Sequence, residues 1–320
     1  MNQYLITIDI GGTKVAGGLI DTHNLSLVYI YEQKAIKGKP GLVQTMTAVI
    51  SHLKQVAIKK NYQLSTTINI GMAGNINPQN PLVLPGTAVN LGVSPTEFDN
   101  LNIKQFFNQN LGEQWQFNVC NDGFSQLAGG FFQCVSNKQP LKNKKVAYIG
   151  PGTGLGGAFA RFNGKTLEFY TDGHIYDMVL KSITGQCVFA EGLFSGTGFF
   201  NQYNISLKDV NSNLELLKTY EQEINHLGEY LYQICRNIYL GSFKKTSNYQ
   251  WTSYDYQAVQ GTRIFFMGGS VGTRGKIADR LIDRAKKMLE KEFDLEFTFY
   301  KIANAQAAAL LGAAIFFDNK

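Results

Sequence analysis

The stretch LITIDIGGTKVAGGLID, residues 5–21, decides how the rest of the sequence is interpreted. An apolar run ends at Asp9, a turn of sequence GGTK follows at residues 11–14, and a second apolar run begins at Val15. The second run carries two more glycines and no apolar stripe of helical spacing, so it predicts a strand and the segment predicts a β-hairpin. The turn fits neither the G-x-G-x-x-G fingerprint nor the G-x-x-x-x-G-K-[ST] loop. Taken alone, it is equally compatible with an ordinary hairpin, since glycine turns are common.

The same pattern returns in VAYIGPGTGLGGAFARF, residues 146–162. An offset of 153 − 13 = 140 places Thr153 on Thr13 and Gly152 on Gly12. Two such hairpins at a domain-length spacing predict two similar domains. Successive backbone N–H groups in glycine turns form anion-binding concavities, so the pair predicts a phosphate site. Asp9 is then placed to hold Mg²⁺ beside the phosphate.

Further elements complete a mixed α/β pattern. Strands are expected at 25–33 and 66–74, and at 115–122, where the strand ends in Asn121-Asp122; helices are expected at 41–60 and 303–317. RIFFMGGSVG, residues 263–272, predicts a strand that ends in Gly268-Gly269 before a helix at 277–290. This third glycine element could cradle a nucleotide or be an ordinary strand-to-helix turn. Strands interleaved with helices favour sheets covered by helices.

Composition narrows the class of protein. The 320 residues suit two domains, and the net charge of 30 − 24 = +6 comes from scattered lysines, so no nucleic-acid partner is expected. The four cysteines show no C-x-x-C spacing, which favours reduced thiols in the cytoplasm. The start MNQYLITIDI does not resemble a signal peptide, and no apolar run is long enough to span a membrane.

DIGGTK, NDG, GPGTGLGG, AEGLFSG, MGGSVG and NAQAAALLGAA occur in the order and at about the spacing of bacterial glucokinases and ROK sugar kinases. Residues 4–317 thus resemble this family of actin-like, hexokinase-type ATPases. The resemblance implies an α/β fold of two RNase-H-like domains, with ATP and Mg²⁺ in the cleft between them. We expect the first domain to span 1–120, completed by the C-terminal helix at 303–320, and the second to span 121–302.

The resemblance also implies roles for individual residues. One group matches the nucleotide and magnesium contacts: Asp9 on the magnesium side, Gly11, Gly12, Thr13 and Lys14 in the first phosphate turn, Gly152, Thr153 and Gly154 in the second, and Gly268 and Gly269 beside the adenosine. A second group matches the sugar contacts: Asn90, Asn121, Asp122, His174 and Glu191. Asp122 is the expected general base, because a sugar hydroxyl must lose its proton as the phosphoryl group arrives, and such a base contributes about 10²–10⁴-fold. The alternative for Asp122 is a surface turn.

The sequence departs from the family in three places. Only Cys187 lies between His174 and Glu191, so no four-coordinate zinc site can form there. Thr171, with Asp172 beside it, replaces a sugar-contacting glutamate, which leaves the identity of the sugar open. The polar, aromatic segment 242–261 is an insertion that could be a lid, an oligomer contact or a solvated loop.

These patterns predict an ATP-dependent kinase of carbohydrate metabolism that phosphorylates a hexose or amino-hexose on its 6-hydroxyl, as a glucokinase does. The alternative is a non-catalytic, sugar- or nucleotide-binding ROK-like regulator. A DNA-binding repressor of the family would carry a helix-turn-helix ahead of the first glycine turn, and here Gly11 comes almost at once. A homodimer stays an open expectation.

Overall fold

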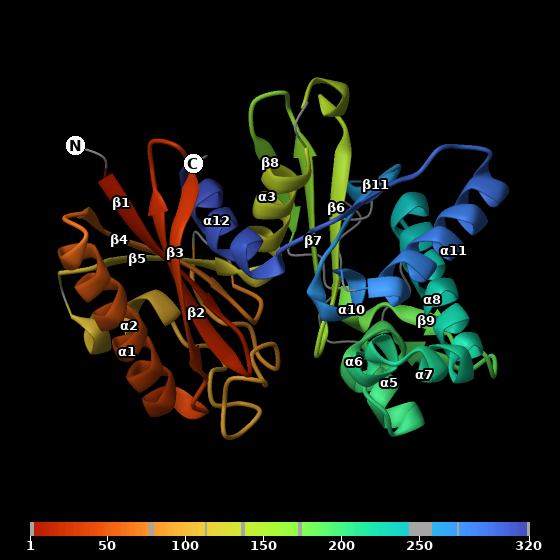
Figure 1. The fold of residues 1–320 in the computed structure, drawn as a ribbon, viewed down its shortest axis with the longest axis horizontal. Helices are drawn as coiled ribbons and strands as arrows, with labels where there is room; N and C mark the ends of the chain where they lie inside the picture. The colour runs from red at the N-terminus through yellow and green to blue at the C-terminus, as the bar shows by residue number, and fades with distance from the viewer. Residues whose placement is uncertain are drawn as a thin grey trace. The chain divides into compact units, whose positions relative to one another are not determined.

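The chain forms two compact units in the computed structural model, which describes residues 3–76, 80–112, 114–135, 138–171, 175–242, 258–273 and 275–318. Unit 1 comprises Met1–Phe132 with Gln306–Lys320, and unit 2 comprises Gln133–Ala305 (Figure 1). The boundary falls inside helix α3 (Asp122–Cys134) rather than after residue 120. Within the described residues, no helix is long and apolar enough to cross a membrane.

Unit 1 is built on a five-stranded sheet of order β3-β2-β1-β4-β5. Its strands are β1 (Gln3–Ile10), β2 (Lys14–Asp21), β3 (Ser26–Lys34), β4 (Gln63–Met72) and β5 (Gln116–Asn121). The first three strands form the antiparallel meander expected from the glycine hairpin, and β4 and β5 run parallel to β1. Asp9 pairs with Gly71, and Met72 pairs with Asn121, so the carboxyl ends of β1, β4 and β5 lie along one edge.

Helices cover both faces of this sheet (Figure 1). The helices α1 (Gly38–Lys59) and α2 (Ile103–Leu111) pack with the isoleucines of β1 in one core. On the other face lie α3 and α12 (Ala305–Asp318). A Cβ at Gly312 would lie 1.7 Å from the carbonyl oxygen of Ser125, so these two helices pack in backbone contact. This packing explains why α3 belongs largely to unit 1.

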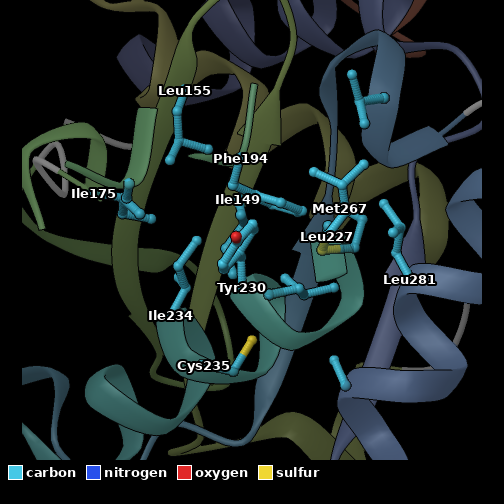
Figure 2. Close-up of a cluster of buried hydrophobic side chains, with 14 of the residues drawn as sticks. Ile149, Leu155, Ile175, Phe194, Leu227, Tyr230, Ile234, Cys235, Met267 and Leu281 are labelled. Carbon is cyan, nitrogen blue, oxygen red and sulfur yellow. The ribbon is translucent and has the colours of Figure 1, made fainter. Parts of the chain in front are cut away.

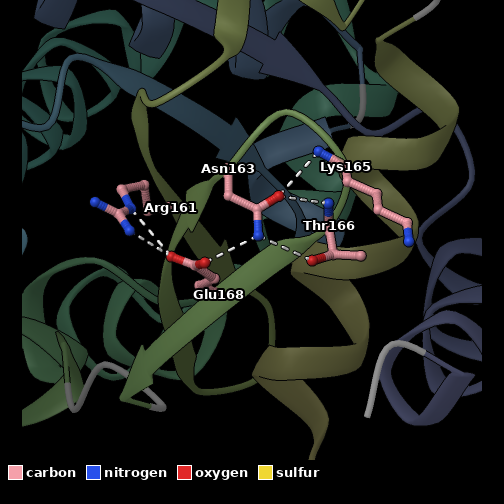
Figure 3. Close-up of polar contacts among 5 residues, drawn as sticks. All are labelled: Arg161, Asn163, Lys165, Thr166 and Glu168. Carbon is pink, nitrogen blue, oxygen red and sulfur yellow. Dashed lines mark hydrogen bonds and ion pairs between the residues drawn. The ribbon is translucent and has the colours of Figure 1, made fainter.

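Unit 2 repeats the pattern with a sheet of order β12-β11-β6-β7-β8. The strands are β6 (Lys145–Pro151), β7 (Leu155–Phe162), β8 (Leu167–Thr171), β11 (Ile264–Met267) and β12 (Thr298–Lys301), and a small sheet pairs β9 (Val179–Lys181) with β10 (Cys187–Phe189). Strands β6 and β7 form the second glycine hairpin, and β11 runs parallel to β6. The next hairpin, β7–β8, turns on Asn163, whose Oδ1 accepts the N–H groups of Lys165 and Thr166 and whose amide donates to Glu168 (Figure 3).

Short and long helices pack against this second sheet. They are α4 (Ala190–Leu193), α5 (Gly196–Tyr203), α6 (Leu207–Ser212), α7 (Leu214–Thr219), α8 (Glu221–Leu240), α10 (Gly269–Thr273) and α11 (Gly275–Phe293), with single turns η1 (Gln139–Leu141) and η2 (Ile175–Asp177). Ile149 and Met267 of the sheet meet Leu227 and Tyr230 of α8 in a common core (Figure 2). The helix expected at 277–290 is confirmed. Most of the insertion at 242–261 lies outside the described residues.

Candidate functional site

The first glycine turn is closed by backbone hydrogen bonds. The N–H of Gly11 donates to the carbonyl of Lys14 at 3.0 Å, and the N–H of Ala35 donates to the carbonyl of Thr13 at 3.0 Å. A Cβ at Gly12 would lie 2.9 Å from the Cβ of Asn90, so glycine permits the loop that carries Asn90 to touch the turn. The structure thereby brings together three of the predicted elements, the first turn, Asp9 and Asn90, within unit 1.

Lys14 is held by protein groups at the end of this turn. Its Nζ lies 3.0 Å from Oε1 of Glu32 on β3 and donates to Oε1 of Gln306 on α12 at 2.5 Å. Lys14 and Glu32 are both exposed, so the ion pair itself adds little to stability. The ion pair holds the positive charge of Lys14 near Asp9. This charge opposes, without cancelling, the effects that raise the pKa of the Asp9 carboxyl.

Two carboxylates lie close together at the carboxyl edge of the unit 1 sheet. Burial, together with the nearby charge of Asp122, raises the pKa of Asp9 to about 7. Asp9 keeps some solvent-exposed surface, so the group remains accessible to a ligand. A bound cation would relieve the repulsion between the negative charges of Asp9 and Asp122, which is strong because Asp9 is poorly solvated. A carboxylate such as that of Asp9 is a hard ligand of the kind that fits Mg²⁺, which needs only one or two of them from the protein.

Asp122 is positioned by the junction between β5 and α3. It is the first residue of α3, where the helix dipole favours a negative charge. Asn121 fixes the junction, since its Oδ1 accepts the N–H of Gly123 at 2.7 Å and its Nδ2 donates to the carbonyl of Gly74 at 2.7 Å. Its amide is thus bonded to the backbone on both sides, whereas Asn90 is exposed.

The second glycine turn is held by hydrogen bonds within the turn and from the start of α5. Its own bond joins the N–H of Gly152 to the carbonyl of Gly154 at 2.8 Å. The N–H groups of Gly196 and Thr197 donate to the carbonyls of Gly152 and Thr153 at 2.7 and 3.2 Å. The start of α5 therefore lies along this turn and fixes its shape.

Glu191 also contacts the second turn. Its Oε2 accepts the N–H of Leu155 at 2.9 Å, and a Cβ at Gly154 would lie 2.8 Å from the same oxygen. The family resemblance implies that Glu191 contacts a sugar, and in this structure its carboxylate lies against the second glycine turn. His174 and Asp172 lie outside the described residues.

The third glycine element packs directly on the second. The N–H of Gly268 donates to the carbonyl of Ile149 at 2.9 Å. Gly269 has φ of +64°, and a Cβ there would lie 2.2 Å from the carbonyl oxygen of Pro151. Only glycine fits both the conformation and the space. The residues predicted for the nucleotide in the second half of the sequence are thus neighbours in unit 2.

A cavity of about 420 Å³ opens beside these two turns. Its lining residues come from the second turn, α5, α6, α10 and α11: Gly152, Thr153, Gly196, Thr197, Phe200, Ser206, Leu207, Lys208, Asn211, Ser270, Val271 and Ile277. Apolar walls with a few polar groups are typical of small-molecule sites. Sequence reasoning missed the residues from α5 and α6, although the Ser195-Gly196 pair before them gave a signal.

A larger hollow, of about 770 Å³, lies against β9, α8 and α11 and is lined by none of the predicted nucleotide or sugar residues. The smaller cavity is therefore the candidate site in unit 2. Cys187 is exposed in β10. Within the described residues, no group of three or more His, Cys, Asp or Glu side chains could hold a metal ion. The expectation that the protein binds no zinc stays a prediction.

The sequence matches the model of the ROK family over residues 5–320. No curated protein matches it at a significant level.

Three solved structures illustrate the similarity of fold. A ROK family glucokinase from Streptomyces griseus, in complex with glucose and AMPPNP, has a TM-score of 0.66 and 17% identity over 97% of this chain and 98% of that one. An inorganic polyphosphate/ATP-glucomannokinase from Arthrobacter sp. strain KM has a TM-score of 0.64 and 17% identity over 99% of both chains. A ROK family transcriptional regulator, a homologue of the E. coli MLC protein, has a TM-score of 0.67 and 13% identity over 99% of this chain and 79% of that one. The TM-scores establish the actin-like ATPase fold, and identities of 13–17% leave the activity to be argued from the site.

Proposed function

Because the chain belongs to the ROK family, we propose that it is an ATP-dependent sugar kinase that transfers a phosphoryl group to the 6-hydroxyl of a hexose or amino-hexose. The observation that carries the proposal is the carboxylate pair Asp9 and Asp122 at the edge of the unit 1 sheet. Kinases and regulators of the family share the fold, so the fold cannot separate them. A base and a second carboxylate beside a phosphate turn are what phosphoryl transfer requires.

In this proposal Asp122 is the general base. The sugar 6-hydroxyl donates its proton to the Asp122 carboxylate as the oxygen attacks the γ-phosphorus of ATP, and ADP leaves. The hydrogen bonds of Asn121 to the backbone hold the start of α3, and so hold Asp122 in place. Asn90 is exposed and free to orient the sugar. Most of the remaining acceleration comes from positioning and from charge stabilisation.

Asp9 would hold Mg²⁺, directly or through water. Its raised pKa means that the carboxyl is partly protonated at neutral pH, so Asp9 would bind the cation more readily at higher pH, where it is ionised. When bound, Mg²⁺ neutralises charge on the phosphate oxygens. Lys14 keeps the Asp9 carboxyl from becoming still harder to ionise.

The nucleotide occupies the cavity of unit 2. Phe200, Leu207 and Val271 offer apolar surface for the adenine, and the backbone of the second glycine turn faces the phosphates. The glucokinase from Streptomyces griseus was solved with AMPPNP, which supports an adenine nucleotide here.

A non-catalytic regulator is the second candidate. The observation that favours it is Thr171 in place of the sugar-contacting glutamate, together with the similarity in fold to the MLC homologue. A protein that binds sugar or nucleotide without turnover would be consistent both with Thr171 and with the similarity in fold to the MLC homologue.

The test is ADP release from ATP and Mg²⁺ with glucose, mannose, fructose, N-acetylglucosamine or N-acetylmannosamine. The proposal expects ADP release that depends on one or more of these sugars and saturates with it. Saturable sugar binding without ADP release would instead establish the regulator.

A further inference from the structure

A single carboxylate, that of Glu97, ties together two segments beside the first glycine turn. Its Oε1 accepts the N–H of Lys39 at 2.7 Å, and its Oε2 accepts the N–H of Val93 at 2.8 Å. Lys39 belongs to the first turn of α1, and Val93 lies in the loop of residues 84–99 that carries Asn90, here termed the Asn90 loop. Glu97 itself belongs to the Asn90 loop, so one carboxylate oxygen bonds within this loop and the other bonds to α1.

The start of α1 needs this partner. The first N–H groups of a helix have no partner within it. The residue before α1, Lys37, makes no side-chain cap bond, and the first turn contains no acidic residue. A carboxylate at this end is also favoured by the helix dipole. The backbone donors at Lys39 and Val93 accordingly hold the pKa of Glu97 below its usual range.

The same segments fix the place of Asn90. The N–H of Gly38 donates to the carbonyl of Leu91 at 2.8 Å, and Nζ of Lys37 donates to the carbonyl of Asn90. Leu91 is 5% exposed and packs into the core of unit 1. Asn90 itself touches the first glycine turn at Gly12.

We propose that Glu97 is a positioning residue that sets Asn90 against the first glycine turn and thereby determines sugar affinity. This inference rests on the proposed function in one respect, the role of Asn90 as a sugar contact. Glu97 does not touch the sugar in this scheme; it acts by joining the Asn90 loop to α1.

The experiment compares the wild type with Glu97→Ala and Glu97→Gln, and uses Glu215→Gln as the control at an exposed glutamate of α7. Calorimetry gives the Kd of the best-bound sugar and of ATP, a thermal melt gives the Tm, and hydrogen exchange follows the amides of residues 86–95. Calorimetric Kd values do not depend on turnover, so they also apply to a non-catalytic protein.

Glu97→Ala removes both acceptors and should weaken sugar binding about tenfold or more, since a charge-assisted hydrogen bond is among the stronger ones. Glu97→Gln keeps one acceptor and should fall between Ala and the wild type. ATP binding should stay within about twofold in both, because the cavity proposed for the adenosine lies in unit 2 and the side-chain hydrogen bonds of Glu97 reach Lys39 and Val93 rather than the first glycine turn. Exchange at Val93 should speed up, and Glu215→Gln should match the wild type.

Two results would overturn the inference. One is a sugar Kd close to that of the wild type in Glu97→Ala, with only a lowered Tm, which would make Glu97 a purely structural residue. The other is a wild type that binds no sugar at all. A wild type that binds sugar and releases no ADP would refute the kinase, while the Kd values would still decide the role of Glu97.

Discussion

The two glycine hairpins have the same backbone pattern and different surroundings. In unit 1, Asp9 pairs with Ala16, next to the last pair before the turn. In unit 2, the equivalent place in the ladder belongs to Gly150, which pairs with Gly156. A Cβ at Gly150 would lie 2.2 Å from the hydroxyl of Tyr148, so the ring of Tyr148 fills the space that the Asp9 side chain has in unit 1. At this position of the ladder, one hairpin thus carries a carboxylate and the other carries a glycine.

This difference indicates that the two halves of the duplicated fold offer different chemical groups at their glycine turns. The first turn lies beside charged side chains, Asp9 and Lys14. The second turn is held by backbone bonds from Gly196 and Thr197 and by Glu191. Backbone amides suit an anionic ligand, and the carboxylate suits a cation. The repeat therefore supplies two similar glycine turns, and the side chains beside them make the two turns suited to different ligands.

The largest expected effect on folding is at Gly150. Gly150→Ala places a methyl group against the buried ring of Tyr148. Overpacking of this kind destabilises by about 1–3 kcal/mol, so the Tm should fall by roughly 2–12 °C. Its partner across the hairpin is the control, because a Cβ at Gly156 would lie 3.9 Å from that ring. Equal melting temperatures for Gly150→Ala and Gly156→Ala would show that Tyr148 does not fill this place.

An effect of comparable size and opposite sign is expected from Asp9→Asn, and it depends on pH. The pKa of Asp9 is raised to about 7 in the folded protein, so between about pH 4 and 7 the folded state binds more protons than the unfolded state. Stability therefore decreases as pH rises through this range. Asp9→Asn removes the buried charge and should be more stable than the wild type by about 1–3 kcal/mol at pH 8, a value reduced for the partial exposure of Asp9.

Thermal melts without Mg²⁺ at pH 5, 6, 7 and 8 give this comparison directly. The advantage of Asp9→Asn should shrink steadily towards pH 5, where Asp9 is protonated in the folded wild type. Melting temperatures of the two proteins that change in parallel with pH would contradict the raised pKa.

The smallest of these effects concerns Glu191. Glu191→Ala leaves the N–H of Leu155 without its acceptor and loosens the second turn. The loss of one charge-assisted hydrogen bond should raise the KM for ATP about five- to tenfold. If Glu191 instead acts mainly on the sugar, as the family resemblance implies, the KM for sugar will rise while that for ATP stays constant. The matched control is Glu215→Gln, on α7.

Sequence patterns predicted the parts of the fold that repeat or that have clear periodicity. The strands β1 to β3 and the long helices α1 and α11 follow from apolar spacing, and the glycine turns mark the hairpins. The offset of 140 aligned the second strands of the two hairpins correctly. It misaligned the first strands by one residue, because three residues lie between the paired Pro151 and Leu155, whereas four lie between the paired Ile10 and Val15.

Other parts of the site could not be predicted, for physical reasons. The helices α5 and α6 are too short for a periodic signal, so Phe200 and Asn211, which line the cavity of unit 2, could not be predicted. Glu97 is 58 residues from Lys39 in the sequence, and nothing local indicates that the two meet. The placement of Glu191 on the second turn also depends on tertiary packing, through the bonds of Gly196 and Thr197.

We propose that the carboxylates of unit 1 perform the chemistry, and the rate of phosphoryl transfer in Asp122→Asn tests this role. Asparagine keeps the shape of the side chain and removes the proton acceptor. With the best sugar of the panel, kcat should fall about 10²-fold or more while the sugar Kd and the Tm stay near the wild type. A kcat equal to that of the wild type would remove Asp122 from the mechanism and contradict the account.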